Sequence, residues 1–179
     1  MTILVRTTAP AEAPITLSEA KAQIRVDHNE EDVLIQHYID AATSLLDGSA
    51  GLLGRCLVTQ SWKMEVDALT GPILLPFPDT VIDEAKFADG DAEDVPYRRE
   101  MCGQRPVLIP LQGWGRSAVI SFTAGYGAPQ DVPATLRQAM LLLIAHWYDN
   151  REAVTIGAAG APLSMAVDAL IAPSRLQRV

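Results

Sequence analysis

The side chains that could carry acid–base or nucleophilic chemistry are few and scattered along the chain. Three histidines and two cysteines are present: His28, His37, His146, Cys56 and Cys102. A base and a thiol nucleophile are therefore available, but no spacing ties them into a catalytic pair. His146 falls inside an apolar helical run, where a histidine is more often a hydrogen-bonded interior or interface residue than a catalyst. We expect no catalytic residues among these five.

A group of acidic residues in the middle of the chain is the other candidate, because carboxylates could hold a divalent cation. Its members are Asp79, Asp83, Glu84, Asp89, Asp91, Glu93 and Asp94. Their spacing lacks the alternating acids, central glycine and distal glutamate of an EF-hand loop. Dense acidic charge is more typical of a solvated loop. Motifs of zinc proteases, P-loops, dinucleotide-binding folds and serine hydrolases are also missing. We therefore expect no metal site, no cofactor and no enzymatic activity.

Composition narrows the class of protein further. The 179 residues are 49% hydrophobic and 20% charged, as in a globular domain with room for a subdomain. The net charge of -8 argues against binding nucleic acid by neutralising its phosphates. The cysteines lack a CxxC spacing and are expected to be buried thiols of a reducing compartment, although one long-range disulfide is an open alternative. The N-terminal apolar run is too short for a signal peptide.

The elements that would position these residues begin with a long helix predicted over residues 132–152. Pro133 suits its first turn, where a missing N–H costs nothing. An apolar stripe follows the helical spacing along it: Leu136, Met140, Leu143 and Trp147. Leu141 and its neighbours add apolar groups on other sides, so the helix should be buried over most of its circumference. Its uncharged part, residues 138–148, is too short for a membrane span of about 20 residues.

Two shorter helices are predicted near the N-terminus. Thr16 and Glu19 have the spacing of a capping box, which predicts a helix over residues 17–25. Asn29 is expected to cap a second helix with three acidic residues in its first turn. An apolar stripe runs along this second helix to Leu46, and Gly54 is expected to end the helix.

The periodicity changes from helical to alternating after Gly54. Val58, Trp62, Met64 and Val66 fall on one face and polar residues on the other, which predicts a half-buried strand. Further strands are expected near residues 73–75, 80–87, 97–101, 107–109 and 117–123. These segments predict a small antiparallel β subdomain inserted between helices.

The predicted fold class is therefore α+β. A helical core, formed by the two N-terminal helices and the long helix near the C-terminus, carries the inserted β subdomain. We expect N-terminal helices over 1–56, the β subdomain over 57–127, the long helix over 128–152 and a flexible segment over 153–179. In that last segment Ser164 is expected to cap a short helix, and the final residues are basic.

Several blocks of sequence, in the right order, resemble the head-tail connector (adaptor) proteins of tailed phages and gene transfer agents. They are ITLSEAKAQIRVD at residues 15–27, EEDVLIQHYIDAA at 30–42, RCLVTQSW at 55–62, FTAGYG at 122–127, DVPATLRQAMLLLIAHWYDNREA at 131–153 and DALIAPSR at 168–175. Residues 71–113 have no clear counterpart. The resemblance implies a structural virion protein of the phage neck, assembled in the host cytoplasm and without enzymatic activity.

The resemblance further implies a ring of about twelve subunits beneath the portal, a closed cyclic assembly. Double-stranded DNA would pass through its lumen without sequence-specific binding. The other partners would be the portal protein and the next neck or tail protein, such as a stopper, with no membrane involved. The portal interface is expected at Pro173, Ser174, Arg175, Leu176, Gln177, Arg178 and Val179. Subunit packing is expected at Leu136, Met140, Leu141, Leu143 and Trp147.

Two alternatives remain open at this point. The chain could be another neck component, such as a stopper or tail terminator, although long helices framing the sheet are unusual for those β-rich proteins. It could also be a small enzyme or ligand-binding domain, for which a deep pocket joining a histidine to Cys56 or Cys102 would be required.

Overall fold

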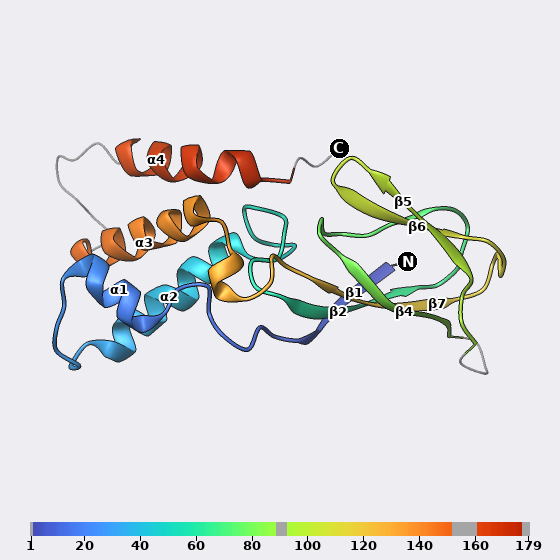
Figure 1. Cartoon of the computed structure of the whole chain (residues 1–179), viewed down its shortest axis with the longest axis horizontal. Coiled ribbons are helices and arrows are strands. Elements are labelled where there is room, and N and C mark those ends of the chain that lie inside the picture. Colours follow the sequence, from blue (N-terminus) through green and yellow to red (C-terminus); the bar gives the residue numbers. More distant parts are fainter. Residues whose placement is uncertain (1, 89–92, 152–160, 177–179) are drawn as a thin grey trace. The chain divides into compact units, whose positions relative to one another are not determined.

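The computed structural model describes residues 2–88, 93–151 and 161–176, and the side chains of residues 161–164 are outside that description. The chain divides into two compact units (Figure 1). Met1–Ala11 and Val58–Tyr126 form the β unit, and Glu12–Leu57 and Gly127–Val179 form the helical unit. Helices and antiparallel sheets are both present, which confirms the predicted α+β class.

The helical unit contains α1 (Leu17–Ile24), α2 (Asp32–Leu46), α3 (Ala134–Asp149) and α4 (Ala161–Ile171), with short 3-10 turns at Pro129–Asp131 and Ala172–Ser174. Helix α3 contacts α1, α2 and α4, as Figure 1 shows. Its buried side chains meet those of α2, among which Ile35, Ile39 and Leu46 are fully buried. The long helix predicted from the sequence thus lies at the centre of this unit.

Helix ends agree with the predictions in one case and differ in three. Helix α2 ends at Leu46 with Asp47 as its C-cap, so the prediction that Gly54 ends this helix was wrong. The capping box of Thr16 and Glu19 is present at α1. Asn29 does not cap α2: the N-cap residue is Glu31, and the Asn29 side chain instead accepts a 2.8 Å hydrogen bond from Lys21 Nζ. That ammonium also pairs with Asp32 at 2.7 Å. Helix α4 begins at Ala161, so Ser164 lies within it and does not cap it.

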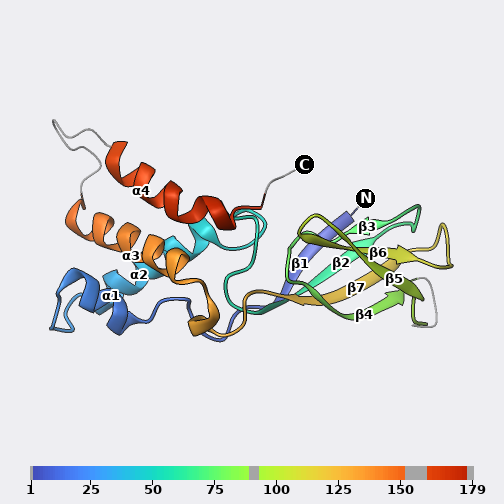
Figure 2. The ribbon, with the colours of Figure 1, turned by 45° about the horizontal axis from the view of Figure 1, so that its top comes forward.

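The β unit contains two antiparallel sheets (Figure 2). One has the order β1-β2-β7-β4, and the other has the order β3-β6-β5. Their bounds are β1 Thr2–Thr8, β2 Gln60–Val66, β3 Ile73–Leu74, β4 Val81–Phe87, β5 Tyr97–Cys102, β6 Arg105–Pro110 and β7 Ala118–Ala124. Strands β2 to β7 lie where the alternation predicted them, within a few residues. Strand β1 was not predicted.

Aromatic side chains fill the core of the β unit. Trp62 and Met64 on β2 are buried, as the alternation predicted. The Trp62 ring lies 5.0 Å from Phe77, and Phe77 lies 6.4 Å from Phe122 on β7, measured between ring centroids. Gly125 ends β7 with φ 139°, and a Cβ at this position would lie 2.6 Å from the backbone nitrogen of Thr59. Only glycine fits this turn.

Candidate assembly surfaces

The C-terminal segment predicted to contact a portal is held against the helical unit up to Leu176. The Leu176 N–H donates a 2.8 Å hydrogen bond to the Leu53 carbonyl, and its side chain lies over Gly54, where a Cβ would come within 3.3 Å of it. Arg175 pairs with Asp168 of α4 at 3.4 Å. Pro173 is exposed and Ser174 half-buried. Gln177, Arg178 and Val179 lie outside the described residues.

The five side chains predicted to pack subunits together divide into two groups on α3. Leu136 and Met140 are fully buried and Leu143 nearly so, within the helical unit itself. Leu141 and Trp147 are half-buried, and the Trp147 ring lies 6.3 Å from Tyr38 of α2. Leu141 and Trp147 are therefore accessible to an adjacent subunit, whereas the other three are covered within the single chain. Their role in subunit packing stays a prediction.

Three side chains join the start of α2 to the end of α3. Arg151 Nη2 donates to Glu31 at 2.7 Å across 120 residues of sequence, and the Tyr148 hydroxyl donates to the same carboxylate. The Arg151 guanidinium also lies 4.7 Å from the centre of the Tyr148 ring. These donors, the Tyr148 hydroxyl foremost, hold the pKa of Glu31 below its ordinary value of 4.5. The same hydrogen bond raises the pKa of Tyr148.

Replacing Glu31 by glutamine is expected to lower the melting temperature at pH 7 and to reduce its dependence on pH. Because the folded state lowers the pKa of Glu31, its stabilising contribution is complete above pH 4.5 and is lost as the pH falls through the lowered value. The difference in melting temperature between wild type and Glu31→Gln should therefore shrink below pH 4.5, measured by circular dichroism. Glu30→Gln, at the exposed neighbouring carboxylate, is the control. A difference that persists unchanged to pH 3 would contradict the expectation.

A second polar contact ties α1 to α3. Glu19 accepts hydrogen bonds from the backbone N–H of Thr16 at 2.9 Å and from its hydroxyl at 2.8 Å, and it also pairs with Arg137. Arg137 reaches the Pro129 carbonyl at 3.2 Å as well. The hydrogen bond from the Thr16 backbone is the main cause that lowers the pKa of Glu19, and Arg137 adds to it. One carboxylate thus caps α1 and orients α3.

The histidines and cysteines do not come together in a site. All three histidines are exposed. His146 was predicted to be an interior or interface residue; it is not interior, and an interface position stays a prediction. Its Nδ1 lies 3.3 Å from the Asn150 side-chain nitrogen. Both cysteines are free thiols. Cys56 is buried as predicted, whereas Cys102 is exposed because it lies at the end of β5, an outer strand of its sheet.

The described members of the acidic group are exposed and several pair with basic side chains. Glu84 pairs with Lys86, and Glu93 lies 3.3 Å from Arg116. Asp89 and Asp91 lie outside the described residues. Within residues 2–88, 93–151 and 161–176, no three His, Cys, Asp or Glu side chains gather as a metal site. These placements agree with a solvated acidic surface.

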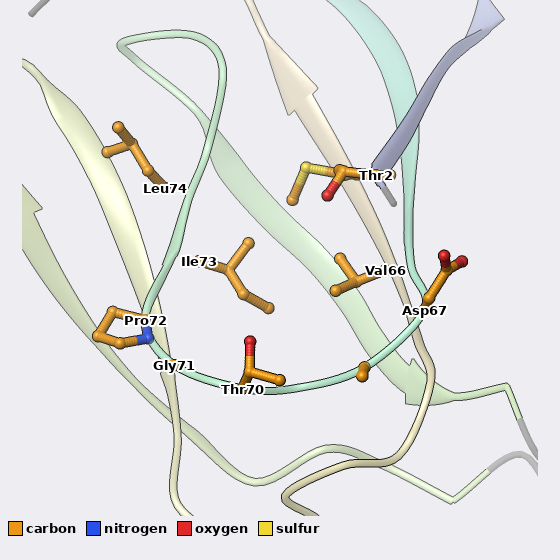
Figure 3. Close-up of a pocket in the computed structure, with 10 residues that line it drawn as sticks. Thr2, Val66, Asp67, Thr70, Gly71, Pro72, Ile73 and Leu74 are labelled. Carbon is orange, nitrogen blue, oxygen red and sulfur yellow. The ribbon is translucent and has the colours of Figure 1, made fainter.

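A groove in the β unit is lined by residues of the β2–β3 connection, with Thr2 and Met64 beside it. Figure 3 shows Val66 and Ile73 pointing toward one another across it. Its volume is about 430 Å³, and neither a histidine nor a cysteine lines it. The enzyme alternative required a pocket joining those residues, and this groove does not provide it. No helix in the part of the chain that the structure describes has the length and apolar content to cross a membrane.

Two features of these surfaces were missed by sequence reasoning. Strand β1 has a detectable signal, because its sequence TILVRTT is rich in β-branched residues and is followed closely by Pro10. The contact of Glu31 with Tyr148 and Arg151 has no such signal in the sequence, because it joins positions that only the tertiary fold brings together.

Comparisons with known proteins agree with these features. Residues 14–75 match the family model described as phage gp6-like head-tail connector protein. No curated protein matches the chain significantly. Solved structures similar to the chain include a chain from the neck of an empty gene transfer agent particle computed with C6 symmetry, at 22% identity and a TM-score of 0.77. A second similar chain comes from the virion of a native gene transfer agent particle, at 26% identity and a TM-score of 0.74. A third comes from the neck of a native particle computed with C12 symmetry, at 24% identity and a TM-score of 0.67.

Each of these three similarities covers 99% of this chain and 97% of the other. The fold is therefore shared along the whole length, including the β unit that the family match leaves out in large part. The family match covers α1, α2 and β2 and ends just beyond β3. The resemblance inferred from the sequence blocks is confirmed, and the matched family is one of structural connectors.

Proposed function

We propose that this chain, which resembles the phage gp6-like head-tail connectors over residues 14–75 and neck chains of gene transfer agents throughout, is a structural head-tail connector. Its place would be the neck of a tailed-phage or gene transfer agent particle, reached after assembly in the host cytoplasm. The observation that carries the proposal is the family match, supported by a common fold over 99% of the chain. Both units, the helical core and the β insertion, are included in that common fold.

In this proposal identical subunits form a closed ring of about twelve, because a repeated heterologous contact generates a ring when its rotation closes. Leu141 and Trp147 support a contact through α3, because they are apolar and only half-buried in the single chain. That surface would be held in place by the buried side chains of α3, which fix the helix in the helical unit: Leu136, Met140 and Leu143. One face of this helix would then pack within the subunit, and another face would contact the adjacent subunit of the ring.

The segment from Pro173 to Val179 is proposed to bind the portal protein. Leu176 is the last described residue, and its hydrogen bond to Leu53 attaches the preceding part of the segment to the helical unit. Gln177, Arg178 and Val179 would then make the contact. Because twelve tails would act from one ring, weak single contacts would add up to stable docking.

The lumen of the ring is proposed to let double-stranded DNA pass without binding it. The net charge of -8 supports this role, because carboxylates repel phosphates and leave them no partners. The next neck or tail protein, such as a stopper, would bind the far side of the ring. A lumen lined mostly by Lys and Arg would contradict this part of the proposal.

The proposal is tested by mixing the purified chain with the portal protein of the same particle and measuring the mass of the complex by analytical ultracentrifugation. A single species with about twelve copies of the chain per portal ring is expected. A chain that stays monomeric in the presence of portal would overturn the proposal.

A further inference from the structure

Part of the segment proposed to bind the portal is already bound within the chain. Residues 172–176 form a strap that leaves the end of α4 and reaches the loop after α2 (Figure 2). At the end of the strap the Leu176 N–H donates to the Leu53 carbonyl at 2.8 Å, and the Leu176 side chain lies over Gly54. While this contact lasts, the Leu176 N–H and the side-chain surface over Gly54 are not available to a second protein.

The seat of the strap, formed by Leu53 and Gly54, is fixed by contacts in which the strap takes no part. The Leu53 N–H donates at 3.3 Å to the carbonyl of Leu46, the last residue of α2. A few residues further on, the Leu57 N–H donates at 2.7 Å to the Asp47 carboxylate. These bonds attach the loop to the end of α2 on both sides of the seat. The seat should therefore keep its shape when the strap leaves it.

The strap itself is held by contacts that are weak in water. The backbone hydrogen bond of Leu176 contributes little net stability, because both of its groups bond to water once they separate, and its side chain is only half-buried. The Arg175–Asp168 pair is 3.4 Å long between side chains that are 43% and 63% exposed, and such pairs stabilise little. Val167 and Ile171 of α4 are buried instead. The strap can therefore detach by local opening while α4 stays in place.

We infer that the strap is an autoinhibitory contact: the free subunit holds Arg175 and Leu176 on the seat, and the strap leaves the seat when the portal protein binds. Release makes these two residues available to the portal together with residues 177–179. The inference rests on the proposed function, because it takes the portal as the partner of this segment. Only subunits whose strap has left the seat are competent to bind, so the seated strap lowers the apparent affinity for the portal.

A reversible disulfide between the seat and the strap tests the inference. A Cβ at Gly54 would lie 3.3 Å from the Leu176 Cβ, close to the separation of about 3.5–4.5 Å between the Cβ atoms of a disulfide. The variant combines Gly54→Cys and Leu176→Cys with Cys102→Ser, which removes the exposed native thiol. Its binding to surface-immobilised portal is measured with the disulfide formed and again after reduction, and circular dichroism shows that both forms are folded.

With the disulfide formed, the apparent dissociation constant for the portal should be at least about tenfold higher than after reduction, because the strap is kept on its seat. The chain with Gly54→Cys and Cys102→Ser alone is the control and should bind equally under both conditions. Equal binding by the oxidised and reduced forms of the test variant would overturn the inference, because the portal would then accept the seated strap. Wild type that fails to bind the portal would instead refute the proposed function.

A second pair of variants leaves the whole tail unchanged. Gly54→Ala places a methyl group against Leu176 and so disfavours the seated strap. Gly48→Ala is the matched control: its φ of 76° is close to the 66° of Gly54, so the backbone strain is comparable, but a Cβ there meets no other described atom within 4 Å. Gly54→Ala should bind the portal at least about twofold more tightly than Gly48→Ala. Equal or weaker binding by Gly54→Ala would overturn the inference.

Discussion

Replacing Leu136 by alanine is expected to lower the free energy of unfolding of the helical unit by about 2–5 kcal/mol. Leu136 lies in the first turns of α3 and is fully buried. Its removal leaves a cavity at the centre of a unit in which α3 contacts α1, α2 and α4. Urea unfolding followed by circular dichroism at 222 nm, in the helical region of the spectrum, measures the change.

Leu141→Ala is the matched control, because it makes the same substitution on the same helix at a half-buried position. Its effect on the free energy of unfolding should be clearly smaller, since fewer contacts are lost. If Leu141 packs against an adjacent subunit, this variant should instead weaken ring formation, measured by analytical ultracentrifugation with portal present. Equal losses of unfolding free energy at both positions would contradict the assigned burial, and normal ring formation would remove Leu141 from the interface.

Deleting Gln177 to Val179 is expected to abolish portal binding while leaving the fold intact. The deletion removes the basic end of the tail but retains the hydrogen bond of Leu176 to Leu53. A loss multiplied over twelve tails should be large, well above about tenfold in the apparent dissociation constant. The apparent dissociation constant is measured by passing the purified chain, with and without the deletion, over surface-immobilised portal.

The position of this deletion matters for its interpretation. A deletion that began at Ser174 would also remove the Leu176 hydrogen bond and the Arg175–Asp168 pair, so lost binding could reflect a disturbed helical unit. Asp168→Ala is the control, because it breaks the pair with Arg175 and keeps the whole tail. Portal binding that survives deletion of the last three residues would show that the tail is not the anchor.

Local patterns predicted most of the secondary structure. The capping box of Thr16 and Glu19, the stripe of α3 and the alternation around Trp62 each depend on neighbouring residues, and each is present in the structure. Asn29 failed as a cap because Lys21, from the preceding helix, takes its side-chain oxygen. A local rule cannot anticipate a competing partner from another element.

The candidate surfaces were harder to predict because they depend on distant pairing. Strand β1 finds its partner in β2, beyond the two N-terminal helices, so its edge position and the groove beside it are properties of the fold. The same holds for Arg151 and Glu31, which lie 120 residues apart. The tail was recognised by resemblance, but its attachment at Leu53 could be seen only in three dimensions.

The head-tail connector assignment is tested most directly by electron microscopy of the purified chain mixed with its portal protein. A closed ring of about twelve chains is expected on one end of the portal, with an open lumen and the C-terminal residues at the contact. Isolated single chains beside undecorated portals would contradict it.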